Sequence, residues 1–452
     1  MDRSTLDAVF KAYDIRGLVD DQLDETFVRA VGAAAAQVIT EGEGAIVVGH
    51  DMRPSSRPLV DAFAAGVTSA GVDVVDIGLA STDLLYFASG DLGLPGAMFT
   101  ASHNPASYNG IKLCRSGARP VSIDSGLAEI RDLLAEDGVP VGDGGGEVRS
   151  DDLLDRYAEH VRGFIDRSLL EPVRFAVDAG NGMAGHVVPA VFDTLPFDVV
   201  PLFFELDGTF PNHPANPIEE ENLRDLQQVV RDEGLPLGLA FDGDADRMFA
   251  VDERGEPVPS SLIAAVVAAR MLDKEPGATV LYNLICSKVV PETIEENGGT
   301  AIRTRVGHSF IKERMAETDA AFAAEHSGHY YFRDNYRADS GLIAALLLLE
   351  AVADEGAPLS EVVAPYARYV PSGEINFEVD DQDAALQRVA DRFAAEGESD
   401  WEDGLTVHLD RAWFNLRPSN TEPVLRLNVE GDDQEAMERL RDGVAATVRG
   451  ER

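Results

Sequence analysis

A serine on a short polar loop is the first group in this sequence that could do covalent chemistry. Ser102 lies between two apolar segments, residues 97–99 and 111–113, separated by two turn-forming dipeptides, Asn-Pro and Asn-Gly. His103 and Lys112 are its near neighbours. A serine beside a base and a cation can carry a phosphoryl group. The same pattern also fits a serine that only caps its loop, so it leaves both interpretations open.

Three aspartates, Asp242, Asp244 and Asp246, alternate with small residues. Carboxylates this close repel one another unless a cation offsets their charge, and oxygen ligands suit Mg²⁺. The spacing also matches the start of an EF-hand calcium loop, but Arg247 stands where that loop needs glycine. A solvated acidic turn is the other alternative in a chain this rich in aspartate.

Two further loops offer the hydrogen-bonding groups that a phosphorylated sugar requires. Glu325, Ser327 and His329 supply donors and acceptors on one loop, which suits sugar hydroxyls. A second loop joins one fixed cation to small polar side chains that can grip a phosphate by charge-assisted hydrogen bonds: Arg417, Ser419, Asn420 and Thr421. An ordinary polar turn between two strands is the alternative for this second loop.

Together these stretches resemble the motifs of the α-D-phosphohexomutases, the phosphomannomutase/phosphoglucomutase family. The matching segments are Thr100-Ala-Ser-His-Asn-Pro105, Asp242-Gly-Asp-Ala-Asp-Arg247, Glu325-His-Ser-Gly-His329 and Arg417-Pro-Ser-Asn-Thr-Glu-Pro423. They occur in the family's order, and the similarity spans nearly the whole chain. The resemblance implies an intramolecular phosphotransferase that interconverts hexose 1-phosphate and hexose 6-phosphate. The reaction would pass through a phosphoserine and a hexose 1,6-bisphosphate, which also serves as activator.

The resemblance also implies roles for individual residues. Ser102 would carry the phosphoryl group and, with the three aspartates, bind one Mg²⁺ per chain. His103, Lys112 and His329 are candidate general acids and bases, and Arg247 would hold charge in place. The implied contacts to the phosphorylated hexose are Tyr13, Arg16, His308, Glu325, Ser327, His329, Arg417, Ser419, Asn420 and Thr421.

Two details of the motifs bear on the branch of the family. The opening Tyr13-Asp-Ile-Arg-Gly17 and Asn420 favour enzymes acting on glucose and/or mannose phosphates over phosphoglucosamine mutases, which stay the alternative. One residue departs from the family pattern: Ile285 stands where many relatives have a lysine. Whether Lys288 replaces that lysine is left open.

The elements that must position these side chains form a strand–helix–strand pattern that occurs three times. The strands of the three units are expected at residues 45–49 and 72–77, 173–177 and 197–202, and 278–283 and 300–305. Such strands pair in parallel through a right-handed crossover. Each unit is followed by a further strand that ends in a polar loop: the loop of Ser102, the aspartate loop, or the loop of Glu325. Because ligands collect at the carboxyl ends of such strands, the three loops are expected to face one cleft.

We therefore expect an α/β protein with three topologically similar mixed α/β domains around a central cleft and a C-terminal α+β domain. The predicted domains are 1–148 with the phosphoserine loop, 149–252 with the metal-binding loop, 253–370 with the sugar-binding loop and 371–452 with the phosphate-binding loop. In the last domain, strands are expected at residues 375–379, 405–409, 412–416 and 424–429, and helices at 383–395 and 434–448.

A glycine-rich turn supports a remote alternative from another class. Gly180-Asn-Gly-Met-Ala-Gly185 follows a strand and opens a helix, and Glu205 follows about 20 residues later, as in a dinucleotide-binding fingerprint. An NAD-dependent oxidoreductase would fit this turn. However, the segment of residues 150–251 is short for a two-half nucleotide fold, and the family has a similar turn as a structural feature.

The charge of the chain is strongly negative. Eighty acidic residues face 38 basic ones, for a net charge of -42, and the only lysines are Lys11, Lys112, Lys274, Lys288 and Lys312. We expect no nucleic-acid partner for such a chain. An acidic, lysine-poor surface is typical of a cytoplasmic protein in molar salt, where the Debye length is about 3 Å, and favours a halophilic archaeon as the source. An ordinary acidic protein with an arginine-rich composition is the alternative.

Neither a membrane nor export is expected for this sequence. No apolar run approaches the ~18 residues of a membrane span, and the N-terminus lacks a signal-peptide pattern. Cys114 and Cys286 fit no metal or redox spacing and are expected to be reduced thiols in the cytoplasm. The sequence leaves the oligomeric state open.

Overall fold

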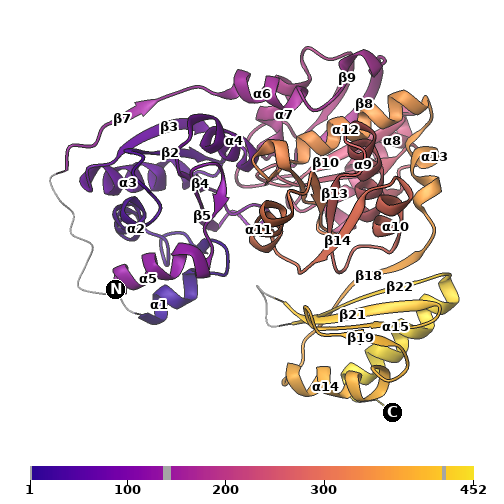
Figure 1. Cartoon of the computed structure of the whole chain (residues 1–452). Helices are drawn as coiled ribbons and strands as arrows, with labels where there is room; N and C mark the ends of the chain where they lie inside the picture. Colours follow the sequence, from indigo (N-terminus) through magenta and orange to yellow (C-terminus); the bar gives the residue numbers. More distant parts are fainter. Residues whose placement is uncertain (1–2, 136–143, 420–423, 452) are drawn as a thin grey trace.

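The computed structural model describes residues 3–135, 144–419 and 424–451, and it contains four β-sheets (Figure 1). Each sheet lies mainly within one of the four predicted domains. The first three domains pack together, and the fourth, in yellow, lies below the third. This architecture confirms the predicted fold class.

The first sheet has the strand order β1-β5-β4-β2-β3-β7, with β6 paired to β5. Its strands are β1 (Ile15–Leu18), β2 (Ala45–His50), β3 (Asp73–Leu79), β4 (Gly96–Phe99), β5 (Tyr108–Arg115), β6 (Arg119–Pro120) and β7 (Val148–Ser150). Its helices are α1 (Arg3–Val9), α2 (Glu25–Val38), α3 (Ser56–Ser69), α4 (Thr82–Leu92) and α5 (Ala128–Ala135).

The second and third sheets have the orders β12-β11-β10-β8-β9 and β14-β13-β15-β16-β17. The elements of the second domain are α6 (Leu154–Arg162), β8 (Val173–Asp178), α7 (Ala184–Phe192), β9 (Phe197–Leu202), α8 (Arg224–Glu233), β10 (Leu237–Phe241), β11 (Met248–Asp252) and β12 (Pro257–Val258). Those of the third are α9 (Ser260–Lys274), β13 (Thr279–Asn283), α10 (Val289–Glu296), β14 (Thr300–Thr304), α11 (His308–Thr318), β15 (Phe322–Ala324), β16 (Tyr330–Phe332), β17 (Ala338–Asp339), α12 (Gly341–Glu355) and α13 (Leu359–Val363).

One four-strand arrangement recurs in the three sheets. The strands β5-β4-β2-β3, β11-β10-β8-β9 and β16-β15-β13-β14 occupy equivalent places, with three strands parallel and the first antiparallel. The strands β4, β10 and β15 lead into the loops of Ser102, Asp242 and Glu325. The predicted repeat is therefore present, and it places the three polar loops at equivalent strand ends.

The predicted domain boundaries stay predictions, because the sheets overlap two of them. β7 pairs with β3 and extends the first sheet to Ser150, and β12 pairs with β11 and extends the second to Val258. Both strands are two or three residues long and carry little apolar signal.

The first three domains share one continuous hydrophobic core. It contains Leu85 of α4, Phe175 of β8 and Tyr330 of β16, all buried. Residues 342–349 of α12, one of the two longest apolar runs of the chain, are buried in this core. No helix in the described part of the chain is long and apolar enough to span a membrane. Cys114 and Cys286 are buried free thiols.

The fourth domain has its own core and the strand order β18-β22-β21-β20-β19. Its elements are β18 (Val370–Phe377), α14 (Gln382–Phe393), β19 (Glu398–Asp400), β20 (Leu405–His408), β21 (Ala412–Pro418), β22 (Leu425–Gly431) and α15 (Gln434–Arg449). β18 begins five residues before the predicted strand, because Pro371 to Gly373 read as a linker from sequence. The pairing of β18 with β22 is irregular at this point, so the strand continues across the interruption.

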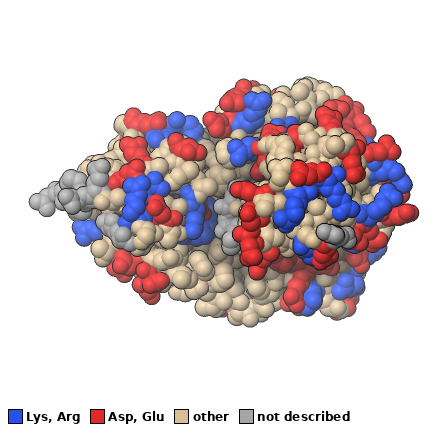
Figure 2. All heavy atoms as spheres, turned by 90° about the horizontal axis from the view of Figure 1, so that it is seen from below, with Lys and Arg blue, Asp and Glu red and all other residues tan. Residues whose placement is uncertain are grey.

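Acidic and basic side chains are interspersed on the surface. On the face seen from below they alternate over all visible domains (Figure 2). Many are paired across elements, such as Arg333 with Glu275 at 2.6 Å and Arg368 with Glu296 at 2.6 Å. The arginines thus lie among carboxylates and offset part of the acidic excess locally.

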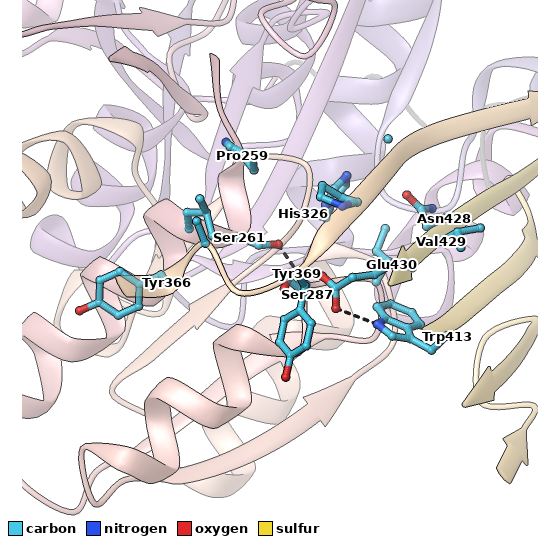
Figure 3. A pocket seen from close by; sticks show the side chains of 15 residues that line it. Pro259, Ser261, Ser287, His326, Tyr366, Tyr369, Trp413, Asn428, Val429 and Glu430 are labelled. Carbon is cyan, nitrogen blue, oxygen red and sulfur yellow. Dashed lines mark hydrogen bonds between the residues drawn. The ribbon is translucent and has the colours of Figure 1, made fainter. Parts of the chain in front are cut away.

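A hollow of about 280 Å³ lies between the third and fourth domains (Figure 3). Ile285 lines this hollow, together with Trp413 of β21 and Tyr369 of the connecting segment. The Lys288 Nζ lies 5.8 Å from the centroid of the Tyr369 ring, and its backbone N–H donates to Glu430 at 3.0 Å. Lys288 therefore packs against Tyr369, which lines the hollow, and Ile285 contributes apolar surface to the hollow.

Candidate active site

The loop of Ser102 is held in an uncommon backbone conformation. Ser102 has a φ of 49°, a left-handed conformation that a non-glycine residue adopts only where its surroundings enforce it. Arg53, buried and paired with Asp51, donates to the backbone carbonyls of Ser102 at 2.9 Å and Asn104 at 2.7 Å. It also donates to the carbonyl of Pro105 at 2.8 Å. One arginine thus ties together the backbone carbonyls of the serine and of the residues that follow it.

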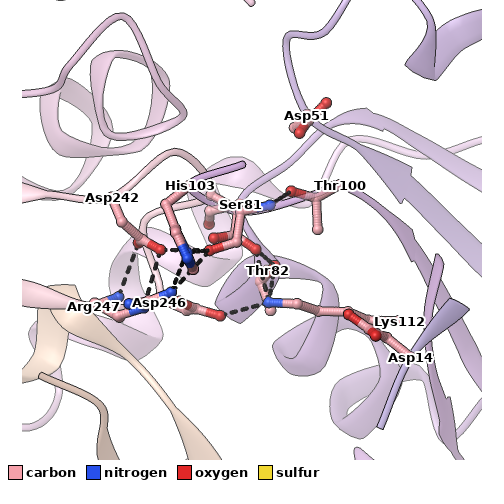
Figure 4. Close-up of polar contacts among 12 residues, drawn as sticks. Asp14, Asp51, Ser81, Thr82, Thr100, His103, Lys112, Asp242, Asp246 and Arg247 are labelled. Atoms are coloured by element: carbon pink, nitrogen blue, oxygen red, sulfur yellow. Dashed lines mark hydrogen bonds and ion pairs between the residues drawn. The ribbon is translucent and has the colours of Figure 1, made fainter. Parts of the chain in front are cut away.

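The Ser102 hydroxyl contacts the second domain directly. Figure 4 shows His103 beside Asp242 and Arg247, the residues that surround this hydroxyl. Its Oγ donates to Asp242 Oδ2 at 2.7 Å and lies 3.1 Å from His103 Nδ1. Arg247 Nη2 donates to the same Oγ at 3.3 Å and also contacts the His103 ring. The serine, its neighbouring imidazole, a carboxylate and a guanidinium therefore converge at one buried point.

Small residues allow the aspartate loop to approach the serine loop this closely. A Cβ on Gly243 would lie 2.3 Å from the Ser102 carbonyl oxygen, and Ala245 adopts a φ of 61°. The glycine-rich turn of the second domain packs behind it, since a Cβ on Gly182 would lie 2.7 Å from the Gly243 carbonyl oxygen. Packing against the aspartate loop is thus a structural reason for Gly182.

The three aspartates fit a divalent cation. One oxygen from each of Asp242, Asp244 and Asp246 lies within 4.8 Å of the others, and all three residues are buried. Asp244 Oδ1 and Asp246 Oδ1 are buried without a hydrogen-bond partner among the described residues. Unpartnered buried carboxylate oxygens are costly, and an oxygen-binding metal such as Mg²⁺ would satisfy them.

Lys112 and His103 have opposite pKa shifts. Burial opposes the charge of Lys112, but its ion pairs with Asp244 at 2.8 Å and Asp246 at 2.7 Å raise the pKa of its ammonium well above the ordinary value. Burial and the positive charge of Arg247 hold the pKa of His103 well below its ordinary value. Lys112 is therefore protonated and His103 neutral near pH 7.

The loop of the third domain places its polar groups beside the aspartates. The Glu325 carboxylate accepts from the Tyr331 hydroxyl at 2.6 Å and from the Gly307 N–H at 3.2 Å. His329 Nδ1 lies 2.8 Å from Ser327 Oγ, and His329 Nε2 lies 3.8 Å from Asp246 Oδ1. The backbones of the two loops also meet, because Met248 N–H donates to the Gly328 carbonyl at 3.2 Å. Tyr330 to Phe332, which follow this loop, are buried core residues.

The N-terminal candidates reach two different loops. Tyr13 packs edge-on against His308, with ring centroids 4.8 Å apart, and a Cβ on Gly307 would lie 2.5 Å from its hydroxyl oxygen. His308 begins α11, and burial lowers its pKa well below the ordinary value. Arg16 donates to Asn104 in the serine loop at 2.5 Å. Tyr13 thus lies beside the start of α11, and Arg16 lies beside the serine loop.

Arg417 is the candidate cation that the fourth domain contributes to this site. It is 3% exposed at the end of β21, and burial lowers the pKa of its guanidinium. Both Glu325 and Tyr13 lie within electrostatic reach of it. Ser419 N–H donates to the Val424 carbonyl at 2.9 Å. Asn420 and Thr421, also candidates from the sequence, lie outside the described residues.

Comparison with known proteins identifies the family. Models described as phosphoglucomutase/phosphomannomutase alpha/beta/alpha domains I, II and III and C-terminal domain match residues 7–138, 155–255, 259–369 and 374–447. The chain belongs to the phosphoglucomutase/phosphomannomutase family. It is therefore an enzyme of the mutase type.

Relatives cover nearly the whole chain. A protein of Xanthomonas campestris pv. campestris named "Phosphohexose mutases" is 42% identical over 424 residues, which are 93% of this chain and 94% of that protein. A phosphomannomutase of Methanocaldococcus jannaschii is 37% identical and covers 95% of both chains. The crystal structure of a phosphoglucomutase/phosphomannomutase family protein from Burkholderia thailandensis has a TM-score of 0.89 at 32% identity, with 100% of this chain and 98% of that chain covered.

Two residues of this phosphoglucomutase/phosphomannomutase site were not singled out from the sequence. They are Arg53, which follows the strand expected at residues 45–49, and Thr82. Thr82 Oγ1 donates to Asp244 Oδ2 at 2.6 Å. Arg53 and Thr82 act on residues 49 and 162 positions away. A local pattern carries no signal for such contacts, although an arginine and an aspartate at a strand end were a hint for Arg53.

Proposed function

We propose that this chain is a phosphohexomutase that interconverts the 1- and 6-phosphates of glucose and mannose through a phosphoserine at Ser102 and a hexose 1,6-bisphosphate. The observation that carries the proposal is the contact of Ser102 Oγ with Asp242 at 2.7 Å, inside a ring of carboxylates and cations built by two domains. A serine that only capped its loop would not need a buried carboxylate from another domain.

The residues around Ser102 support a division of roles in phosphoryl transfer. Mg²⁺ held by Asp242, Asp244 and Asp246 with Ser102 supplies positive charge to the transferring phosphoryl group when bound. Arg247, 3.3 Å from the serine oxygen, adds a fixed positive charge on the same side. The neutral His103 is suited to accept a proton, and the protonated Lys112 is suited to donate one. His329 stays the third candidate for proton transfer.

The remaining loops would hold the rest of the substrate. We assign the hexose hydroxyls to Glu325 and Ser327, with Tyr13, Arg16, His308 and His329 as further contacts. The phosphate that is not transferred would bind at Arg417, Ser419, Asn420 and Thr421. After the first transfer the bisphosphate turns round between these two ends, so that its other phosphoryl group returns to Ser102.

The substrate class follows from what such a site can discriminate. Glucose and mannose differ only at C2, whereas Glu325 and Ser327 would bind the hydroxyls at C3 and C4. A site can reject an analogue by about 10⁴-fold only where that analogue leaves a buried polar group unpaired. We therefore expect turnover of both glucose 1-phosphate and mannose 1-phosphate, with glucosamine 1-phosphate as the alternative substrate.

The experiment compares kcat/KM for the three 1-phosphates with Mg²⁺ and a trace of hexose bisphosphate under one salt condition. Comparable values for glucose and mannose 1-phosphate support the proposal. A clear preference for glucosamine 1-phosphate assigns the chain to the other branch, and no turnover of any of the three contradicts the proposed function.

We further propose that the enzyme works in the cytoplasm of a halophilic archaeon. The support is the net charge of -42 together with the scarcity of lysine. At low salt such a charge repels an anionic substrate at long range, and high salt weakens this distant repulsion more than the close contacts at Arg247 and Arg417.

A further inference from the structure

A fully buried carboxylate lies where the first three domains meet. Asp83, in the first turn of α4, has no solvent exposure. Its Oδ2 accepts from the Tyr157 hydroxyl of α6 at 2.5 Å and from the Ser340 hydroxyl at 2.7 Å. Its Oδ1 accepts from the Ser81 hydroxyl. The three donors come from three domains and converge on one side chain.

Two helices begin at this carboxylate. Ser81 is the N-cap of α4 and accepts from Leu84 N–H, and Ser340 is the N-cap of α12 and accepts from Ile343 N–H. Each cap hydroxyl therefore accepts from its own helix and donates to Asp83. The positive ends of both helix dipoles also face the carboxylate, which helps to stabilise its charge without an ion-pair partner.

The residue before Asp83 contacts the metal-binding loop. Thr82 Oγ1 donates to Asp244 Oδ2 at 2.6 Å, and Thr82 N–H donates to the Asp244 carbonyl at 3.0 Å. The position of the first turn of α4 thus sets the orientation of an aspartate that we assign to the metal. Asp83 fixes that turn against α6 and α12.

Burying a carboxylate between three domains costs free energy of desolvation. Apolar residues of similar size often stabilise such a junction as well or better, because they avoid the cost of removing a charge from water. The directional hydrogen bonds do what apolar contacts cannot: they fix the rotation and register of the turn. A role in orienting Thr82 accounts for a carboxylate at this point.

We propose that Asp83 is a positioning residue that acts through Thr82 to orient Asp244 for metal binding and phosphoryl transfer. This inference rests on the proposed function for its consequence in catalysis. Its consequence for metal binding needs no sugar. Partners behind a metal ligand affect metal affinity by about 10–100-fold in other proteins, which sets the expected scale.

The test measures the Kd of Mn²⁺, as a probe for the metal site, by electron paramagnetic resonance in the full-length protein without substrate. Asp83→Asn, which keeps the shape and removes the charge, is expected to raise the Kd by about tenfold or more. It should also lower kcat more than it raises KM for the sugar phosphate. The matched control is Asp91→Asn, at the other end of α4, which removes the ion pair with Arg156 of α6. This control should keep the wild-type Kd, although it too breaks a contact between α4 and α6.

A double-mutant cycle tests the route through Thr82. In the Thr82→Val background the side-chain bond to Asp244 is already lost, so adding Asp83→Asn should raise the Kd by less than about twofold. Additive effects, or a folded Asp83→Asn protein with wild-type Mn²⁺ affinity, would overturn the proposal. If Asp83→Asn does not fold, Tyr157→Phe and Ser340→Ala each remove one donor and enter the same cycle with the same criteria. A wild-type protein that binds Mn²⁺ in an Asp83-dependent way but turns over no hexose phosphate would contradict the proposed function and leave this inference standing.

Discussion

Contacts from neighbouring residues hold Ser102 in its left-handed backbone conformation. Arg53 binds the carbonyl groups of Ser102 and Asn104, and Gly243 packs against the serine's own carbonyl. The resulting geometry directs the hydroxyl at Asp242. Strain of this kind is typical of residues whose position matters for reaction.

Gly243 lies so close to the Ser102 carbonyl that adding one methyl group is predicted to disturb the site. In Gly243→Ala the new Cβ would lie 2.3 Å from the Ser102 carbonyl oxygen, so the two loops must separate. A displacement near 1 Å at reacting groups can cost roughly 100-fold, and we expect a loss of that order in kcat. The matched control is Gly44→Ala, whose Cβ would meet nothing within 4 Å. Equal activity of the two variants would show that the contact does not position the serine.

The buried carboxylate of Asp83 predicts a specific pH dependence of stability. Burial raises its pKa from 3.8 in an exposed setting to about 6, although the hydroxyls of Ser81, Tyr157 and Ser340 oppose the rise. The folded state therefore binds a proton that the unfolded state has released, and this contribution to stability is lost as pH rises through 6. The Asp83→Asn variant has no such group.

The measurement is the free energy of unfolding by urea for wild type and Asp83→Asn between about pH 5 and 7.5, in constant high salt. Wild type should lose stability relative to the variant as pH rises, with most of the change below about pH 6 and little above about pH 7. A difference that stays constant over this range would contradict the assigned pKa shift.

At the scale of elements, the loop after β2 supports the loop after β4 through one side chain. Arg53 supplies a planar fork of donors to several carbonyls at once, which a lysine cannot reproduce. We expect Arg53→Lys to lower kcat and the melting temperature together. Arg224→Lys, in the exposed pair with Glu221, is the control and should change neither appreciably. Wild-type kcat in a folded Arg53→Lys protein would show that the serine loop does not depend on this support.

The elements that the sequence predicted best are the parallel strands of the three repeated units, both buried ones such as β2 and less buried ones such as β9. Residues 197–202 form a strand with the predicted limits, and the other repeat strands differ by one or two residues at their ends. The sequence did not predict β7 and β12. A strand of two or three residues forms by pairing with the edge of a sheet that is already present, so its own residues carry little apolar pattern. The serine, aspartate and Glu325 loops could be predicted because each carries its chemistry in a few consecutive residues. Arg53, Thr82 and Asp83 could not, because their roles depend on contacts between domains.

The whole molecule gives a prediction about salt. Screening of the net charge of -42 should raise the thermal stability from dilute buffer into molar KCl. An ordinary acidic protein would reach a plateau once the Debye length falls below about 8 Å, near physiological ionic strength. Melting temperatures across this range are the measurement. A curve that is flat above about 0.2 M would contradict adaptation to high salt.

The central claim is that Ser102 carries the transferred phosphoryl group, and it has one direct measurement. The protein is incubated with glucose 1,6-bisphosphate and Mg²⁺, freed of ligand, and examined by intact mass and peptide mapping beside Ser102→Ala. We predict one phosphoryl group on Ser102 in the wild type, none in the variant, and a loss of turnover by several orders of magnitude in a variant that still folds. Near-normal turnover in Ser102→Ala, or a phosphoryl group on another residue, would contradict the account.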